Sequence, residues 1–260
     1  MKIMEPRWDS KFELKPGKWV FVPNGDTIEL GAKIKDELRQ RWKAPAYYYH
    51  LRQGGHVAAL KAHLGQTCFI HVDIENFFQR INRSRVTRVL KGMYSYAEAR
   101  DIANLSTVRL PEDAQKRYIL PYGFVQSTLL ASICLRKSAL GNYLKQLSAT
   151  DGIEVSVYVD DIIISLNDEA LAENIFADVK RMAEKSGFDL NQKKEQRPAD
   201  KISAFNIELS QNSLHVLPDR WHAFLDAMRE DGNPHRHQAI LGYVDSVNPA
   251  QANQLQAEML

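Results

Sequence analysis

The sequence is poor in cysteine and has no long apolar run. Its two cysteines, Cys68 and Cys134, both stand beside apolar residues. We therefore expect reduced thiols in the core, and neither a disulfide framework nor a cysteine-rich metal site. No stretch reaches the roughly 20 apolar residues of a membrane span, and the first residues lack an apolar segment of signal-peptide length. These absences predict a soluble, cytoplasmic protein with no membrane partner.

The sequence also has no large excess of either positive or negative charge. The chain has 34 Lys+Arg and 32 Asp+Glu, a formal net charge of +2. Any affinity for nucleic acid must therefore come from basic residues gathered locally and not from a global basic field. The length of 260 residues is enough for a sizeable core in one elaborated domain or in two subdomains that share a cleft.

Hydrophobic periodicity predicts a mixed α+β chain. We expect helices over residues 27–42, 56–64, 84–93, 96–106, 127–144 and 169–186. We expect strands over residues 19–23, 67–72 and 201–209, and a strand, turn and strand around Asp160. After Pro218 the apolar residues return at helical spacing, which indicates two or three short helices.

The most informative feature is Asp160-Asp161, a pair of carboxylates within an apolar, β-forming run over residues 155–164. Two adjacent like charges are costly to remove from water unless a cation neutralises them, and a divalent metal ion is the usual cation at such a turn. A third carboxylate, Asp73, ends the predicted strand of residues 67–72. If the two β elements are neighbours in one sheet, the three carboxylates converge; the alternative is a solvated acidic hairpin.

Three converging carboxylates are suited to hard divalent cations. We expect two Mg²⁺ ions about 4 Å apart, with Mn²⁺ as an alternative, which would activate a 3′-hydroxyl and stabilise a departing pyrophosphate. Phosphoryl transfer requires mainly positioning and charge neutralisation, so few residues suffice.

Five segments, in order, resemble the motifs of reverse transcriptases. FIHVDIENFF at residues 69–78 resembles motif A, LPYGFVQS at 120–127 motif B, YVDD at 158–161 motif C, GFDLNQKK at 187–194 motif D, and AFNI at 204–207 motif E. One tetrapeptide is a weak signal, whereas five motifs in family order over residues 47–209 are specific.

The resemblance implies roles for residues at matching positions. Asp73 and Asp160 correspond to the metal ligands, Asp161 to a supporting carboxylate, and the Ile74 carbonyl to a further ligand. Asn76 and Phe77 would offer backbone amides to a triphosphate, and Tyr158, Tyr122 and Gly123 would contact substrate.

Two further roles have structural alternatives. Phe78 corresponds to the aromatic gate that disfavours a 2′-hydroxyl; the alternative is a core aromatic. Lys194 corresponds to the motif D lysine that neutralises or protonates pyrophosphate. The alternatives are a solvated lysine at this position or Lys193 in the same role. Lys15, Lys18 and Arg52 are candidates to hold triphosphate or template phosphate, each with a surface charge as the alternative.

Motif B departs from the family pattern. Tyr122 stands where most reverse transcriptases have glutamine, and Ser127-Thr128 stands where they have Ser-Pro. Tyrosine adds bulk, stacking capacity and a phenolic hydroxyl, which predicts altered substrate or template handling. The carboxylates are all kept, so loss of activity is not the inference.

The resemblance implies a right-hand polymerase of α+β class. Fingers would span residues 1–66, with an insertion at about 84–118. A palm, with an antiparallel sheet packed on helices, would span 67–210, and a short helical thumb 211–260. No RNase H, integrase or endonuclease segment is expected. Among bacterial relatives, which include retron and abortive-infection enzymes, the Gly-Gly-His segment at residues 54–56 and the altered motif B favour the phage-defence groups.

The leading prediction is an RNA-directed DNA polymerase that adds dNTPs to a 3′-hydroxyl in antiviral defence. Its partners would be an RNA template or non-coding RNA, the DNA product, and a partner protein or second copy. Two alternatives stay open: a template-independent or protein-guided nucleotidyltransferase, and a non-catalytic RNA-binding assembly subunit. Retention of all three carboxylates argues against the second.

Overall fold

The computed structural model of the protein describes residues 6–111, 113–230 and 232–259. Parts of the predicted fingers (residues 1–5 and 112) and of the predicted thumb (231 and 260) lie outside these ranges. Within the described ranges, no helix is both long and apolar enough to cross a bilayer. The chain divides into two units that are each discontinuous in sequence, and we describe each by itself.

The unit that holds the acidic motifs comprises Ala46–Asp73, Leu147–Asp178 and the residues from Asn191 onward. Its four-stranded antiparallel sheet has the order β6-β7-β3-β8, with β6 Glu154–Tyr158, β7 Asp161–Leu166, β3 Cys68–Asp73 and β8 Gln196–Ala199. Every residue of β3 is buried, as is β7 from Ile162 to Leu166, because apolar side chains point to both faces of the sheet. In this register Asp73 faces Asp161 across the β3–β7 pair. The two β elements that carry the carboxylates are therefore neighbours in one sheet, which is what convergence of the carboxylates requires.

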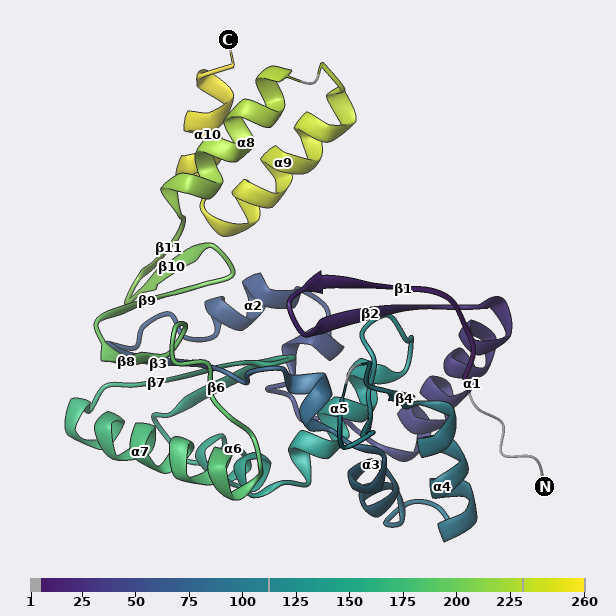
Figure 1. The fold of residues 1–260 in the computed structure, drawn as a ribbon. Helices are drawn as coiled ribbons and strands as arrows, with labels where there is room; N and C mark the ends of the chain where they lie inside the picture. The colour runs from purple at the N-terminus through teal and green to yellow at the C-terminus, as the bar shows by residue number, and fades with distance from the viewer. Residues whose placement is uncertain (1–5, 112, 231, 260) are drawn as a thin grey trace. The chain divides into compact units, whose positions relative to one another are not determined.

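The same unit contains a second sheet and a group of helices. The second sheet is formed by β9 Lys201–Ala204, β10 Ile207–Ser210 and β11 Ser213–Val216, and the short helices η1 Tyr49–Leu51 and α2 Gly55–Lys61 precede β3. Helices α8 Pro218–Glu230, α9 Pro234–Val247 and α10 Pro249–Ala257 lie side by side (Figure 1). Asn233 and Asn248 cap α9 and α10, each with proline in the first turn, where its missing N–H costs nothing. These helices pack against the second sheet through buried apolar side chains, which include Trp221, Phe224, Val244 and Leu255.

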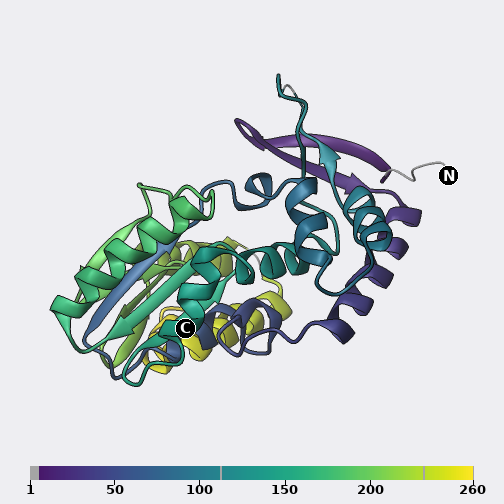
Figure 2. The ribbon, with the colours of Figure 1, turned by 90° about the horizontal axis from the view of Figure 1, so that it is seen from below.

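The other unit comprises the described residues up to Pro45, with Ile74–Gln146 and Val179–Leu190. It begins with a two-stranded ribbon of β1 Trp8–Lys15 and β2 Lys18–Pro23 (Figure 2), followed by α1 Gly25–Arg41. The remaining elements are η2 Phe77–Arg80, α3 Arg83–Leu90, α4 Tyr96–Leu105, β4 Val108–Arg109, β5 Tyr118–Ile119, α5 Ser127–Arg136 and α6 Ala139–Leu147. Side chains cap three of these helices: Asn24 for α1, Asn82 for α3, and a Ser95–Glu98 capping box for α4. Helix α7, Glu169–Lys185, passes from one unit into the other along the chain.

Two predicted elements are wrong in the same way, because each is two elements joined by a tight connection. The helix expected over residues 127–144 divides into α5 and α6. The Ser138 hydroxyl accepts the Gly141 N–H at 3.1 Å and so starts a new helix, and a Cβ at Gly141 would lie 2.0 Å from the Leu135 carbonyl oxygen. The strand expected over 201–209 is the β9–β10 hairpin, whose turn residues Phe205 and Asn206 both have positive φ, as a two-residue hairpin turn requires.

Candidate active site

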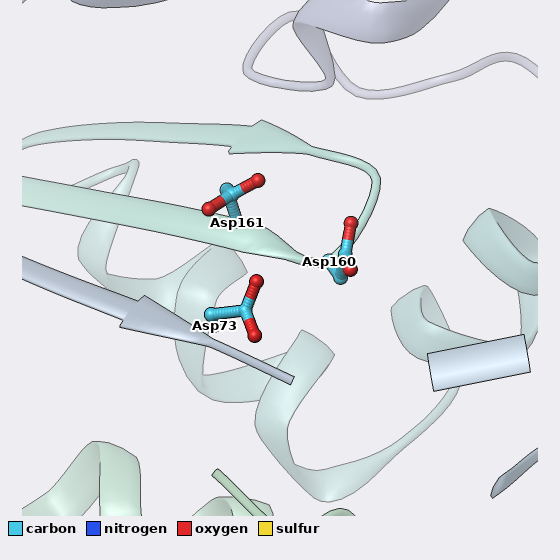
Figure 3. Close-up of side chains that lie close together, drawn as sticks. All are labelled: Asp73, Asp160 and Asp161. Atoms are coloured by element: carbon cyan, nitrogen blue, oxygen red, sulfur yellow. The ribbon is translucent and has the colours of Figure 1, made fainter. Parts of the chain in front are cut away.

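Three carboxylates meet where β3 and β7 lie side by side (Figure 3). One oxygen from each of Asp73, Asp160 and Asp161 lies within 4.8 Å of the other two. Asp73 is the last residue of β3, Asp161 is the first of β7, and Asp160 lies in the turn between β6 and β7. Sheet register and a tight turn therefore assemble the cluster from positions far apart in the sequence.

The turn that carries Asp160 is strained and is held by a histidine. Val159 has φ of 61°, which is unfavourable for a β-branched residue. Its backbone N–H donates to His50 Nδ1 at 2.9 Å. Burial lowers the pKa of His50 to about 4, so the ring is neutral near pH 7 and its Nδ1 can accept this bond. A neutral imidazole from the segment before α2 thus stabilises the turn that places Asp160.

The cluster is electrostatically unbalanced. Burial raises the pKa of Asp160 to about 6, and the neighbouring charges of Asp161 and Asp73 act in the same direction. Asp73, 3% exposed, accepts a hydrogen bond from Asn191 Nδ2 at 3.1 Å and pairs with Lys194 Nζ at 2.6 Å. Burial disfavours charged Lys194, but its hydrogen bond to Asp73 and the three carboxylate charges outweigh burial and raise the pKa of Lys194. The site therefore attracts positive charge.

The donor set fits a hard divalent cation. Carboxylate oxygens are the preferred ligands of Mg²⁺ and Mn²⁺, and a cation would offset both the burial and the like charges that raise the pKa of Asp160. Asp73, Asp160 and Asp161 are the residues that would hold it. Ile74, which follows Asp73 directly, is buried and bridges to Leu190; its carbonyl as a ligand stays a prediction.

Tyr158 belongs to an aromatic cluster. Its ring meets His50, His56 and Phe205 edge-on, with centroid separations of 5.9, 5.9 and 5.2 Å. Phe205 is one of the two turn residues of the β9–β10 hairpin, so motif C and motif E side chains contact each other. The predicted substrate contact of Tyr158 stays a prediction.

Phe78 and Tyr122 contact each other within the other unit. Their ring centroids lie 4.7 Å apart, in an edge-on arrangement, and Lys18 Nζ lies 4.4 Å from the Tyr122 ring centroid. Gly123 has φ of 102°, and a Cβ there would lie 2.2 Å from the Phe21 carbonyl oxygen. Glycine therefore allows β2 to approach motif B, where the Phe21 N–H donates to the Tyr122 carbonyl at 3.0 Å.

The remaining predicted residues have mixed placements. Asn76 is exposed with a positive φ just before η2, whereas Phe77 is buried against Phe188. Lys15 and Lys193 are exposed. Arg52 donates to the Ala46 carbonyl at 2.7 Å and stacks on Tyr49, which gives it a local structural contact. Their proposed substrate contacts stay predictions.

Four site residues were missed by sequence reasoning. His71, buried on β3, lies 2.9 Å from Asp161 through Nε2, and Gln196 contacts the other ring nitrogen. His71 is two residues before Asp73, so strand alternation places both on one face and could have revealed it. His50 and Asn191 had no local signal, because their partners lie 109 and 118 positions away.

A basic cavity of about 470 Å³ lies in the unit that contains motif B. Its lining includes five cationic side chains: Arg80, Arg85, Arg88, Lys137 and Lys185. None of the described lining residues is acidic, although Arg80 pairs with nearby Asp189. Burial lowers the pKa of Arg85, and the charge of Arg88 contributes in the same direction. Positive charge is therefore concentrated locally in a chain of near-neutral composition.

Comparisons with known proteins agree with the motif pattern. Over 213 residues, 74% of this chain, the sequence is 26% identical to retron Mx65 reverse transcriptase of Myxococcus xanthus, 49% of which is covered. The structure resembles a foamy viral protease-reverse transcriptase in complex with double-stranded DNA, with a TM-score of 0.52 and 17% identity over 93% of this chain and 36% of that one. A second foamy viral structure, in complex with RNA/DNA hybrid, has a TM-score of 0.50 and 17% identity over 92% of this chain and 27% of that one.

The chain thus spans about half the length of the curated relative it matches. The foamy viral likeness confirms the predicted α+β right-hand polymerase fold. The family model described as "Reverse transcriptase (RNA-dependent DNA polymerase)" matches residues 13–217, most of the chain. The chain belongs to the reverse transcriptase family.

Proposed function

We propose that this protein is an RNA-directed DNA polymerase that adds deoxynucleotides to a 3′-hydroxyl. The observation that carries the proposal is the convergence of Asp73, Asp160 and Asp161 in a chain of the reverse transcriptase family. All three positions keep a carboxylate, which a purely structural palm would not need. The division into fingers, palm and thumb is part of the same proposal.

The three carboxylates would hold the divalent cations. Bound cations supply Lewis-acid activation of the hydroxyl and neutralise charge on the leaving pyrophosphate. Asp73 and Asp161 hold their orientation through hydrogen bonds to Asn191 and His71. The strained turn fixes Asp160.

Lys194 is the positive charge that the chain itself supplies. More than half of its side chain is exposed, and the side chain is long and flexible. The ammonium group can therefore move away from Asp73 without a change in the backbone. We place it on phosphate oxygens of the incoming nucleotide, where it would neutralise or protonate the leaving group.

Phe78 would select deoxynucleotides. Its ring is 7% exposed and is supported edge-on by Tyr122, so it has little room to swing away from an added hydroxyl. In this proposal Tyr122 affects sugar selection by holding the Phe78 ring in place. A direct contact of Tyr122 with substrate would add to this effect.

The RNA partner is supported by the basic cavity. Cationic side chains without carboxylates suit phosphate groups, and a chain of net charge +2 requires such local placement. The template-independent alternative would also need phosphate contacts for its primer, so the comparison with and without RNA below separates the two. We also propose that the protein acts in the cytoplasm and in antiviral defence. The similarity to a retron reverse transcriptase does not distinguish the phage-defence groups from retrons.

The test is extension of a DNA primer on an RNA template with Mg²⁺, comparing wild type with Asp160→Asn. We expect the variant to lose roughly a thousandfold in rate. Because burial and like charges disfavour ionised Asp160, the metal-free variant should keep or gain thermal stability. Asp151→Asn, an exposed carboxylate in the loop before β6, is the control and should extend primers normally.

Two results would overturn the proposal. If Asp160→Asn extends primers at the wild-type rate, the carboxylate cluster takes no part in the reaction. Equal incorporation with and without RNA, with a product unrelated to the template, would favour the template-independent alternative.

A further inference from the structure

His71 has a partner at each ring nitrogen. It is 3% exposed on β3, and Nε2 lies 2.9 Å from Asp161 Oδ1. Nδ1 lies 2.9 Å from Gln196 Nε2, on the neighbouring strand β8. The ring therefore connects a carboxylate of the cluster to a strand that contributes no carboxylate to it.

The backbone of β9 fixes the orientation of Gln196. The Ser203 N–H, which can only donate, lies 2.8 Å from Gln196 Oε1. The Ser203 carbonyl, which can only accept, lies 2.6 Å from Gln196 Nε2. Both contacts require the amide nitrogen to be on the side that faces His71.

The direction of the remaining bonds follows. An amide nitrogen donates, so His71 Nδ1 must accept and carries no proton. The neutral ring then carries its proton on Nε2, which donates to Asp161 Oδ1. The two backbone groups of Ser203 thus orient Gln196, and through Gln196 and His71 they influence how Asp161 is held.

The two hydrogen-bonded carboxylates are held differently. Asp73 pairs with a cation, Lys194, whereas Asp161 is held by a neutral donor. A neutral donor orients one carboxylate oxygen without cancelling the negative charge, so the other oxygen stays available to a cation. A lysine or arginine at position 71 would orient Asp161 equally but would neutralise it.

We propose that His71, with its tautomer fixed by Gln196, is a positioning residue that orients Asp161 for divalent cation binding. This inference rests on the proposed function only in taking the carboxylate cluster as the cation site. The tautomer and the hydrogen bond are properties of the metal-free protein.

The first experiment reads the tautomer directly. Long-range ¹H–¹⁵N spectra of histidine-labelled, metal-free protein should show His71 with a protonated Nε2 and an unprotonated Nδ1, assigned by loss of the signal in His71→Gln. Gln196→Met removes the donor to Nδ1, so the Nδ1 resonance should shift while the acceptor Asp161 still favours the proton on Nε2. A protonated Nδ1 in wild type, or an unchanged Nδ1 resonance in Gln196→Met, would overturn the proposal.

The second experiment measures Mn²⁺ affinity by calorimetry without nucleotide. His71→Leu keeps the volume but lacks the donor, and should bind Mn²⁺ roughly tenfold more weakly. His71→Gln offers an amide N–H to Asp161 and should recover most of the affinity. His63→Gln is the control, because His63 is equally buried and contacts Ser156 and Ser165, not the carboxylates. Its Mn²⁺ affinity should match wild type.

Unchanged affinity in His71→Leu would overturn the inference, as would equal weakening in His71→Leu and His71→Gln. Failure of the proposed function is a separate result. A wild-type protein that binds Mn²⁺ through an oriented Asp161 but extends no primer would contradict the polymerase proposal and leave the role of His71 intact.

Discussion

Lys194 Nζ lies 2.6 Å from Asp73 Oδ2, so the chain places its own cation on an oxygen that a metal ion would use. In the proposed function, the ammonium group and a divalent cation would therefore compete for Asp73. We expect Lys194→Gln to bind Mn²⁺ several-fold more tightly in calorimetry without nucleotide, because the internal competitor is gone. Single-turnover incorporation should nevertheless fall about a hundredfold, since charge near the leaving group is lost.

Lys193→Gln is the matched control for this prediction. Lys193 is exposed and adjacent in sequence, but among the described residues its side chain makes no hydrogen bond or ion pair with the carboxylates. It should change neither Mn²⁺ affinity nor rate. If Lys193→Gln reduces the rate and Lys194→Gln does not, then Lys193, and not Lys194, has the role near the leaving group.

Phe78→Val should relax sugar selection. The shorter side chain leaves space where the ring now packs on Tyr122, and the ratio of ribonucleotide to deoxynucleotide incorporation should rise by roughly a hundredfold. Competition between the two nucleotides on one template gives this ratio independently of protein stability. Phe188→Leu should lower the unfolding temperature without changing the ratio, because the buried Phe188 ring packs on Phe77 in the core. An unchanged ratio in Phe78→Val would show that Phe78 is only a core aromatic.

Charge reversal at the basic cavity should weaken RNA binding. Arg88 and Lys137 are exposed lining residues, and the double variant Arg88→Glu/Lys137→Glu should lose at least about tenfold in affinity for single-stranded RNA at low salt. Fluorescence anisotropy between about 50 and 200 mM salt should also show a shallower salt dependence. Lys33→Glu, an exposed lysine of α1 outside the cavity, should have a smaller effect. Equal losses at both places would indicate a general charge effect.

His63 should make the protein sensitive to acid. Burial lowers the pKa of His63 to about 3 in the folded protein, from 6.5 in the unfolded chain. The unfolded chain therefore takes up a proton first as pH falls, so the stability that this group contributes is complete above 6.5 and is lost below it. The loss is roughly 1.4 kcal/mol for each pH unit between these values.

Urea unfolding of metal-free protein at about pH 7 and about pH 5 measures this contribution. His63→Asn should be less stable than wild type at the higher pH, because Ser156 or Ser165 loses a buried partner. The difference between the two proteins should shrink at the lower pH. A difference that stays constant would mean that His63 is not held neutral.

Apolar patterning was sufficient to predict β3, β6 and β7, because these strands are buried on both faces and their residues leave no amphipathic ambiguity. Patterning failed at tight connections. An unbroken apolar stripe runs through Ser138, and a hydroxyl cap cannot be distinguished from an ordinary helical serine until its partner, the Gly141 N–H, is known. Phe205-Asn206 likewise lacks the glycine that usually marks a two-residue hairpin turn.

The motif comparison located the three carboxylates but not what surrounds them. His50, His71 and Gln196 are held by hydrogen bonds over 90 or more sequence positions, and no local pattern encodes such partners. Lys194 was predicted to act on pyrophosphate, whereas its contact with Asp73 depends on the fold that brings residues 121 positions apart together. Residue types were therefore predictable and their partners were not.

The pairing of β3 with β8 has a consequence for how the protein is made. Asp73 leaves the ribosome 121 residues before Lys194, and His71 leaves 125 residues before Gln196. Contacts over such separations form slowly, because a long segment of chain must first be ordered. A nascent chain that ends before Lys194 carries all three carboxylates but neither the lysine that neutralises Asp73 nor the amide that sets the His71 tautomer. Synthesis of the segment after α7 is therefore the step at which the three carboxylates gain the partners that order them.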